Sequence, residues 1–172
     1  AKARVIVISS TGKHFSAGMD LAVFAQGGIE GQGRDRYIAS EQFYRNIAAI
    51  QSSFTCLEAA RVPVLMAIQG GCIGGAVDFA SACDIRWCTE DAFFCIQEIN
   101  IAMTADVGTF PRLQRLMPEG MVREMAYTGM RLGAAEALRL GLVNGVFADA
   151  DALLAHVMGV AREIATKSPL AV

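Results

Sequence analysis

Residues 70–85 read GGCIGGAVDFASACDI and decide the fold of the chain. Four of the first six residues are glycine, and the apolar run VPVLMAIQ, residues 62–69, directly precedes them. An apolar run that enters a glycine turn and continues in small and apolar residues is typical of a buried strand followed by a closely packed helix. The stretch therefore predicts a strand-turn-helix unit with one carboxylate, Asp78, inside its apolar part.

The flanking sequence extends this unit in both directions. Strands are predicted over residues 4–10, 62–69, 84–89, 92–97 and 142–147. Apolar residues three and four positions apart predict helices over residues 35–60, 111–129 and 149–167, and a shorter helix over 133–141 that stops at Gly141. Four glycines within residues 27–33 predict a mobile loop. Alternating strands and helices place the chain in the α/β class.

Length and composition limit the alternatives. The chain has 172 residues, enough for one domain over residues 1–172 and too few for two ordinary ones. With 15 basic and 17 acidic residues mixed along it, the chain has no basic stripe for nucleic acid, and no apolar run reaches the 18 residues that a membrane span needs. Five cysteines without a C-x-x-C pair, and only two distant histidines, predict reduced thiols and no metal site.

The glycine cluster has two interpretations. It lacks the G-K-[ST] ending of a P-loop and the acidic residue of a dinucleotide fingerprint, so tight packing of helix on strand is one explanation. The other interpretation comes from FSAGMDL, residues 15–21, a second turn of small residues that follows a strand. Two such turns can direct two backbone N–H groups at one oxygen, which would form an oxyanion hole for a thioester or ester carbonyl.

Three carboxylates stand in locally apolar sequence: Asp78, Glu98 and Asp106 have no lysine or arginine within three positions. Burial without a cation raises the pKa of a carboxyl group toward neutrality, which suits proton transfer. The alternative is that some of them cap helices, because Asp106 precedes a helical pattern. Asp84 and Asp91 are expected only to end strands or begin turns.

At these motifs the chain resembles the enoyl-CoA hydratase/isomerase (crotonase) superfamily. The resemblance is carried by FSAGMDL, by residues 70–103, by ADVGTFPRL (105–113) and by GAAEALRLGLVNGVF (133–147). It implies an α/β fold in which strand-strand-helix turns repeat as a spiral. The family's first strands and last helices are missing, so the chain is expected to be a fragment with a truncated helical C-terminal part.

The resemblance also implies a ligand, an acyl-CoA thioester. Its carbonyl would lie between the backbone N–H groups of Met19 and Gly75, with Ala17 and Gly74 beside the substrate. No cofactor is implied, because coenzyme A is part of the substrate. The implied assembly is a homotrimer or a dimer of trimers.

The acidic residues at positions 78, 98 and 106 resemble those of the Δ3,5-Δ2,4-dienoyl-CoA isomerase branch. The resemblance implies that Asp106 takes the proton from carbon 2 and that Glu98 returns a proton at carbon 6. Asp78 would tune or position the other two. The closest alternative is a hydratase that uses Glu98 and Asp78, against which a third carboxylate argues. An alternative of another class is a non-catalytic scaffold. The lack of a targeting segment favours a bacterial cytoplasm, and a eukaryotic protein would be mitochondrial or peroxisomal.

Overall fold

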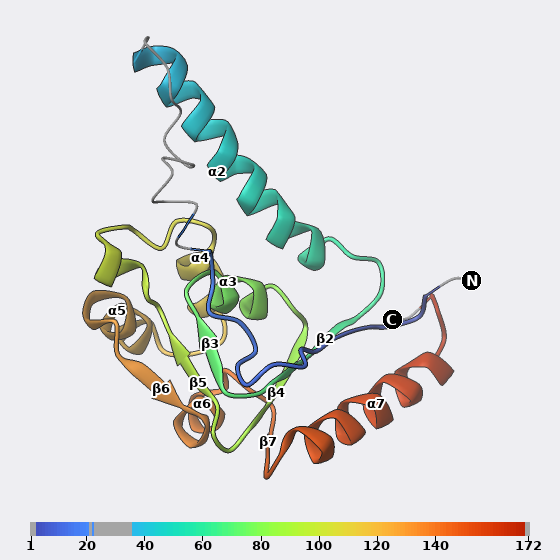
Figure 1. The fold of residues 1–172 in the computed structure, drawn as a ribbon. Helices are drawn as coiled ribbons and strands as arrows, with labels where there is room; N and C mark the ends of the chain where they lie inside the picture. The colour runs from blue at the N-terminus through green and yellow to red at the C-terminus, as the bar shows by residue number, and fades with distance from the viewer. Residues whose placement is uncertain (1–2, 21, 23–35, 171–172) are drawn as a thin grey trace.

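The computed structural model describes residues 3–20, 22 and 36–170 (Figure 1). The loop predicted over residues 27–33 lies outside these ranges. In chain order the elements are β1 (Ile6–Ile8), α2 (Arg36–Glu58), β2 (Val64–Ile68), β3 (Gly71–Ile73), α3 (Gly75–Ser81), β4 (Ile85–Thr89), β5 (Phe93–Cys95), the 3-10 helix η1 (Glu98–Ile101), α4 (Thr109–Leu113), α5 (Glu119–Thr128), β6 (Arg131–Gly133), α6 (Ala134–Leu140), β7 (Val146–Phe147) and α7 (Ala150–Thr166).

The strands form two sheets between which the chain alternates. One sheet has the order β1-β2-β4-β7 with all neighbours parallel, and the other has the order β3-β5-β6, in which β3 and β5 are parallel and β6 is antiparallel. The chain runs from β2 in the first sheet to β3 in the second and then forms α3. It returns to the first sheet as β4 and crosses to the second sheet again as β5. The α/β class and the spiral of strand-strand-helix turns are therefore confirmed.

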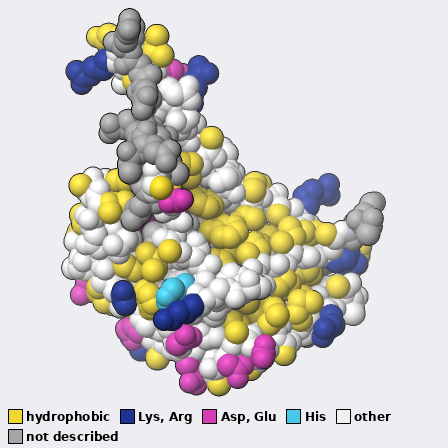
Figure 2. All heavy atoms as spheres, viewed as in Figure 1, with side chains coloured by type: hydrophobic (Ala, Val, Ile, Leu, Met, Phe, Trp, Pro, Cys, Tyr) yellow, Lys and Arg dark blue, Asp and Glu magenta, His cyan; other side chains and the backbone are white. Residues whose placement is uncertain are grey.

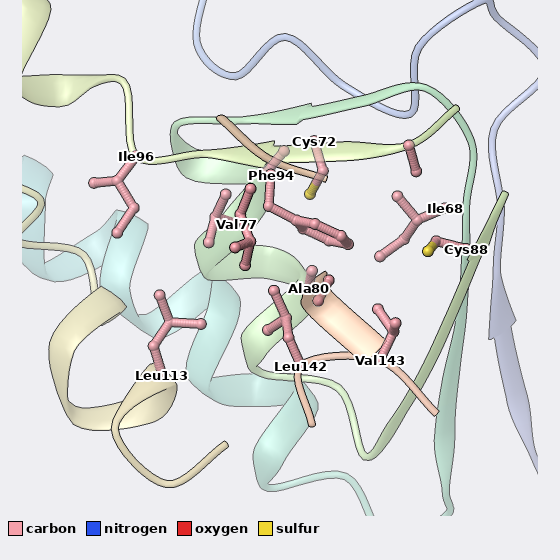
Figure 3. Packing of buried hydrophobic residues seen from close by; sticks show 14 of the residues in the cluster. Ile68, Cys72, Val77, Ala80, Cys88, Phe94, Ile96, Leu113, Leu142 and Val143 are labelled. Carbon is pink, nitrogen blue, oxygen red and sulfur yellow. The ribbon is translucent and has the colours of Figure 1, made fainter. Parts of the chain in front are cut away.

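Strand β2 is buried on both faces, as its unbroken apolar sequence predicts. Successive side chains of a strand point to opposite faces. Val64, Met66 and Ile68 belong to a core cluster with residues of α3, α5 and α6, whereas Leu65 and Ala67 pack in a second cluster against α7. Figure 3 shows the first cluster closing around Phe94.

Helix α2 projects from the rest of the molecule (Figure 1). It confirms the helix predicted over residues 35–60, but none of its residues is buried. Contact with the body is made near its end, where the Phe54 ring lies 6.0 Å from the Phe79 ring of α3 and Leu57 packs on the core. Figure 2 shows apolar side chains gathered on the face below this helix.

Other boundaries differ from the sequence prediction in ways that have local causes. The helix predicted over residues 111–129 is two helices, α4 and α5, because Pro118 is the N-cap residue of α5. Helix α6 ends at Gly141, whose φ of 89° is the left-handed C-cap conformation. Helix α7 begins where predicted, with the Ala152 N–H donating to Asp149 Oδ1 at 2.8 Å. Strands β3 and β6, only three residues each, were not predicted.

Candidate functional site

A cavity of about 410 Å³ opens between the C-terminal half of α2 and the N-terminus of α3. Its walls come from four parts of the chain that are distant in sequence, and most of its lining side chains are apolar. The lining residues are Ser16, Ala17, Gly18, Met19, Ile47, Ile50, Phe54, Gly74, Gly75, Ala76, Phe79, Gln97, Glu98, Ile101, Met103, Thr104, Asp106 and Val107.

The two glycine turns predicted from sequence meet at this cavity. Gly18 has a φ of +85°, and a Cβ there would lie 2.8 Å from the Ile73 carbonyl oxygen and 3.5 Å from the Gly75 nitrogen. The turn is joined to β3 by backbone hydrogen bonds, because Ile73 N–H donates to the Ser16 carbonyl and Ser16 N–H donates to the Gly71 carbonyl. Only glycine at position 18 permits this close approach of two backbones.

The four residues predicted to contact a thioester, Met19, Gly75, Ala17 and Gly74, all line the cavity. Gly75 is the first residue of α3, where a backbone N–H has no acceptor within the helix. Gly74 has a φ of +58°, and a Cβ there would lie 3.3 Å from Glu98 Oε1. The Glu98 carboxyl group therefore lies directly against the glycine turn.

Glu98 and Asp106 both line the cavity. Glu98 Oε2 is buried and has no hydrogen-bond partner among the described residues, and burial, together with the charge of Asp106, raises the pKa of Glu98. Asp106 is exposed, and its backbone carbonyl accepts a hydrogen bond from Gln51 Nε2 at 2.7 Å. The N-cap residue of α4 is Gly108 and no side chain caps this helix, so Asp106 does not have the capping role considered as an alternative.

Asp78 is placed differently from the other two acids. Its side chain is fully buried, and it is not among the lining residues, whereas Ala76 and Phe79 on the same helix are. Thr109 Oγ1 donates to Asp78 Oδ1 at 2.6 Å, whereas Oδ2 is buried without a partner among the described residues. Burial raises the pKa of Asp78 to about 6, with a further contribution from the charge of Glu98. The three acids are thus neighbours, but two rather than three face the cavity.

Arg112 is a functional candidate that sequence reasoning missed. Its side chain is almost wholly buried, and its guanidinium donates to Glu58 Oε2 at 2.8 Å, to Thr55 Oγ1 at 3.1 Å and to the Val107 carbonyl at 3.1 Å. These bonds tie α2 to the turn that carries Asp106, and the Arg112 charge lowers the pKa of Asp78. Nothing in the local sequence distinguishes Arg112 from the exposed Arg115, because the partners of Arg112 on α2 are distant in sequence.

The remaining polar and sulfur groups have structural roles. All five cysteines are free, and burial raises the pKa of Cys83 and of Cys88 to about 12, so these thiols stay protonated. Asp84 accepts from the Val64 N–H at 2.7 Å at the start of β2, and Asp91 accepts from Thr89 after β4, as expected. Among the described residues no group of three or more His, Cys, Asp or Glu side chains could hold a metal ion. None of the helices in the described part is long and apolar enough to cross a membrane.

This fold is that of a large class of α/β proteins, the enoyl-CoA hydratase/isomerase family. The sequence profile of that family matches residues 1–172. The chain belongs to this family, which confirms the resemblance seen in its motifs.

Two curated relatives carry the name of one particular enzyme within this family. The chain is 44% identical to the peroxisomal Δ(3,5)-Δ(2,4)-dienoyl-CoA isomerase of Arabidopsis thaliana, and the match covers 98% of the chain and 61% of the relative. It is 42% identical to the mitochondrial Δ(3,5)-Δ(2,4)-dienoyl-CoA isomerase of Homo sapiens, and that match covers 100% of the chain and 53% of the relative. The chain therefore spans between half and two thirds of the length of these relatives.

Solved structures agree with the fold. An enoyl-CoA hydratase from Bacillus anthracis has a TM-score of 0.83 at 31% identity, covering 98% of this chain and 61% of that one. A protein from Thermobifida fusca YX, solved in complex with acetoacetyl-CoA, has a TM-score of 0.86 at 29% identity, covering 98% and 66%.

Substitution of Gly108 tests the role of Arg112. Gly108 has a φ of +122°, and a Cβ there would overlap the Arg112 guanidinium. We expect Gly108→Ala to displace Arg112 and to lower the free energy of unfolding of the full-length protein by about 2 kcal/mol or more, measured in urea. Gly120→Ala is the matched control, because a Cβ at Gly120 meets nothing within 4 Å, and it should be neutral or stabilising. Equal stability of both variants would contradict the role given to Arg112.

The buried Asp78 predicts a pH-dependent stability. Its pKa is about 6 in the folded state and 3.8 as an ordinary value, so between these pH values the folded state holds a proton that the unfolded state has lost. The free energy of unfolding of the wild type should therefore fall as pH rises through this window, by at most about 3 kcal/mol from this group. Asp78→Asn keeps the acceptor for Thr109 and removes the titration. Its stability relative to wild type should increase from pH 4 to 6 in urea titrations, and a constant difference would contradict the assignment.

Proposed function

We propose that the protein is an acyl-CoA isomerase that converts 3,5-dienoyl-CoA to 2,4-dienoyl-CoA in fatty acid β-oxidation. The observation that carries the proposal is the placement of Glu98 and Asp106 on the wall of one largely apolar cavity. The dienoyl-CoA isomerase names of the relatives at 44% and 42% identity support the same reaction.

The reaction needs two carboxyl groups in opposite protonation states. Asp106, as the carboxylate, removes a proton from carbon 2 of the substrate, and the electron pair spreads through the conjugated system as a dienolate. Glu98, as the acid, delivers a proton to carbon 6, which moves both double bonds by one position toward the thioester. Burial and the charge of Asp106 raise the pKa of Glu98, and this direction supports the role, because a carboxyl group that binds its proton more tightly is better suited to act as the acid.

The glycine turns would stabilise the dienolate. We assign the thioester oxygen to the backbone N–H groups of Met19 and Gly75, with Ala17 and Gly74 along the substrate. Two observations support this: both turns line the cavity, and the missing side chain of Gly18 lets them approach. Rigid N–H donors in an apolar site stabilise charge that develops on a carbonyl oxygen. The acetoacetyl-CoA in the Thermobifida fusca structure supports an acyl-CoA ligand.

Hydration of a 2-enoyl-CoA is the second candidate, because the Bacillus anthracis structure at 31% identity is named a hydratase. In this alternative Glu98 and Asp78 would form the acid and base pair. Asp78 is fully buried and does not line the cavity, which argues against direct contact of its carboxylate with water or substrate. A non-catalytic scaffold would have no use for the Glu98 oxygen that is buried at the cavity without a hydrogen-bond partner among the described residues, since such a group lowers stability.

Several properties of the whole protein remain proposals. The reaction requires no cofactor beyond the coenzyme A of the substrate, and a homotrimer or dimer of trimers is the assembly we expect. The two eukaryotic relatives are named peroxisomal and mitochondrial. A bacterial cytoplasmic location stays a prediction.

A direct assay separates the two candidate reactions. The full-length protein is mixed with a 3,5-dienoyl-CoA or with a 2-enoyl-CoA, and ultraviolet absorbance is followed. We expect absorbance to rise with the dienoyl substrate, because the diene becomes conjugated with the thioester, and to stay constant with the enoyl one. Loss of enoyl absorbance alone would identify a hydratase, and no change with either substrate would overturn both reactions.

Asp106 should be essential to the isomerisation but not to binding. We expect Asp106→Asn to lower kcat about 100- to 10,000-fold, the range for loss of a general base, with little change in Kd for the acyl-CoA measured by calorimetry. Asp151→Asn, at an exposed position on α7, is the control and should retain wild-type kcat. Wild-type turnover in Asp106→Asn would refute the assignment.

A further inference from the structure

Helix α2 carries two adjacent rows of side chains along its C-terminal half. The apolar row lines the cavity and consists of Ile47, Ile50 and Phe54. The polar row consists of Gln51, Thr55 and Glu58. Because both rows repeat at steps of three and four residues and Gln51 follows Ile47 by four, the rows lie side by side on the helix surface. One helix therefore supplies a wall of the cavity and a row of polar groups beside it.

The polar row holds the turn that carries Asp106. Gln51 Nε2 donates to the Asp106 backbone carbonyl at 2.7 Å. The next carbonyl along the chain, that of Val107, accepts a hydrogen bond from the Arg112 guanidinium at 3.1 Å, and the same guanidinium donates to the other two members of the polar row. Two consecutive carbonyls of this turn are thus tied to α2, one directly by Gln51 and one through Arg112.

The turn has no regular secondary structure, so side-chain hydrogen bonds help to fix its position. It lies between the end of η1 at Ile101 and the start of α4 at Thr109. The carboxyl group of Asp106 is attached to this backbone, and the position of the Asp106 carbonyl therefore limits where the carboxylate can lie. A misplacement of a reacting group by about 1 Å can lower a rate on the order of 100-fold. The hydrogen bond from Gln51 thus acts at a point where the rate is sensitive to position.

We propose that Gln51 is a positioning residue for the isomerisation, which acts by holding the backbone of Asp106 so that the Asp106 carboxylate stays beside the cavity wall formed by α2. The inference rests on the proposed function, in which Asp106 takes the proton from carbon 2. Gln51 does not line the cavity, so it acts through Asp106 and not by contact with the substrate. Because the donor and the apolar row belong to one helix, the base keeps a fixed position relative to the wall against which the acyl chain would pack.

The test compares Gln51→Met, which removes the donor at nearly constant side-chain length, with the same substitution at Gln42. Gln42 is exposed on the same helix and donates to Asn46 Oδ1 within α2 at 2.8 Å, so Gln42→Met is the matched control. With the full-length protein and a 3,5-dienoyl-CoA, we expect Gln51→Met to lower kcat about 10- to 100-fold with little change in KM. Gln42→Met should retain the wild-type kcat.

A double mutant identifies Asp106 as the group through which Gln51 acts. In the Asp106→Asn background, Gln51→Met should lower the residual kcat by less than about 2-fold, because the base that Gln51 positions is gone. If Gln51→Met does not fold, Gln51→Ala also removes the donor and should give the same results. Wild-type kcat in the folded Met or Ala variant, or an undiminished effect of that variant in the Asp106→Asn background, would overturn the inference.

Hydrogen exchange separates this inference from the proposed function. A wild-type protein without dienoyl-CoA isomerase activity would overturn the function and the catalytic part of the inference, but the tie between α2 and the turn would still be open to measurement. We expect Gln51→Met to speed amide exchange in residues 102–108 by about 2- to 10-fold, the range for loss of one hydrogen bond, and Gln42→Met to leave it unchanged. Equal exchange in the two variants would show that Gln51 does not hold the turn.

Discussion

Two backbone turns in van der Waals contact set the geometry of the site. The turn at Gly18 lies against β3 and the first residue of α3, and a side chain at position 18 would collide with the Ile73 carbonyl. This contact brings Met19 and Gly75 to one cavity and fixes the start of α3, which carries Asp78 three residues further on. The cavity wall, the candidate N–H donors and the buried acid therefore depend on the absence of one Cβ atom.

The carboxyl groups around this contact oppose stability. Asp78 and Glu98 each bury an oxygen without a hydrogen-bond partner among the described residues, and such groups lower the free energy of unfolding. Arg112 partly offsets this, because its charge favours ionised Asp78 while its hydrogen bonds join α2 to the turn of Asp106. Polar groups that weaken a fold are expected at functional sites, and here they surround the one cavity that the glycine turns shape.

Family membership and site geometry carry different parts of the functional argument. The family profile and the solved structures agree on the fold, which hosts more than one reaction, as the hydratase and isomerase names of the relatives illustrate. The choice between reactions depends on the acids. Asp106 and Glu98 line the cavity while Asp78 is buried and does not, and this arrangement supports the proposed isomerisation over the addition of water.

The sequence by itself determined the parts of this protein that depend on local patterns. The apolar run before Gly70 predicted the fully buried β2, the spacing of Phe43, Ile47 and Ile50 predicted α2, and glycines with flanking strands predicted both turns of the site. Strands β3 and β6 escaped prediction because each contains a glycine and lies where the sequence indicates a turn or the start of a helix, whereas the equally short β1 and β5 lie in apolar runs. Only the tertiary structure decided that Glu98 and Asp106 line the cavity while Asp78 does not, that Thr109 hydrogen-bonds Asp78, and that Arg112 hydrogen-bonds Glu58 and Thr55 of α2. Those contacts join residues far apart in the chain, so their energies arise from packing between elements and leave no local signature in the sequence.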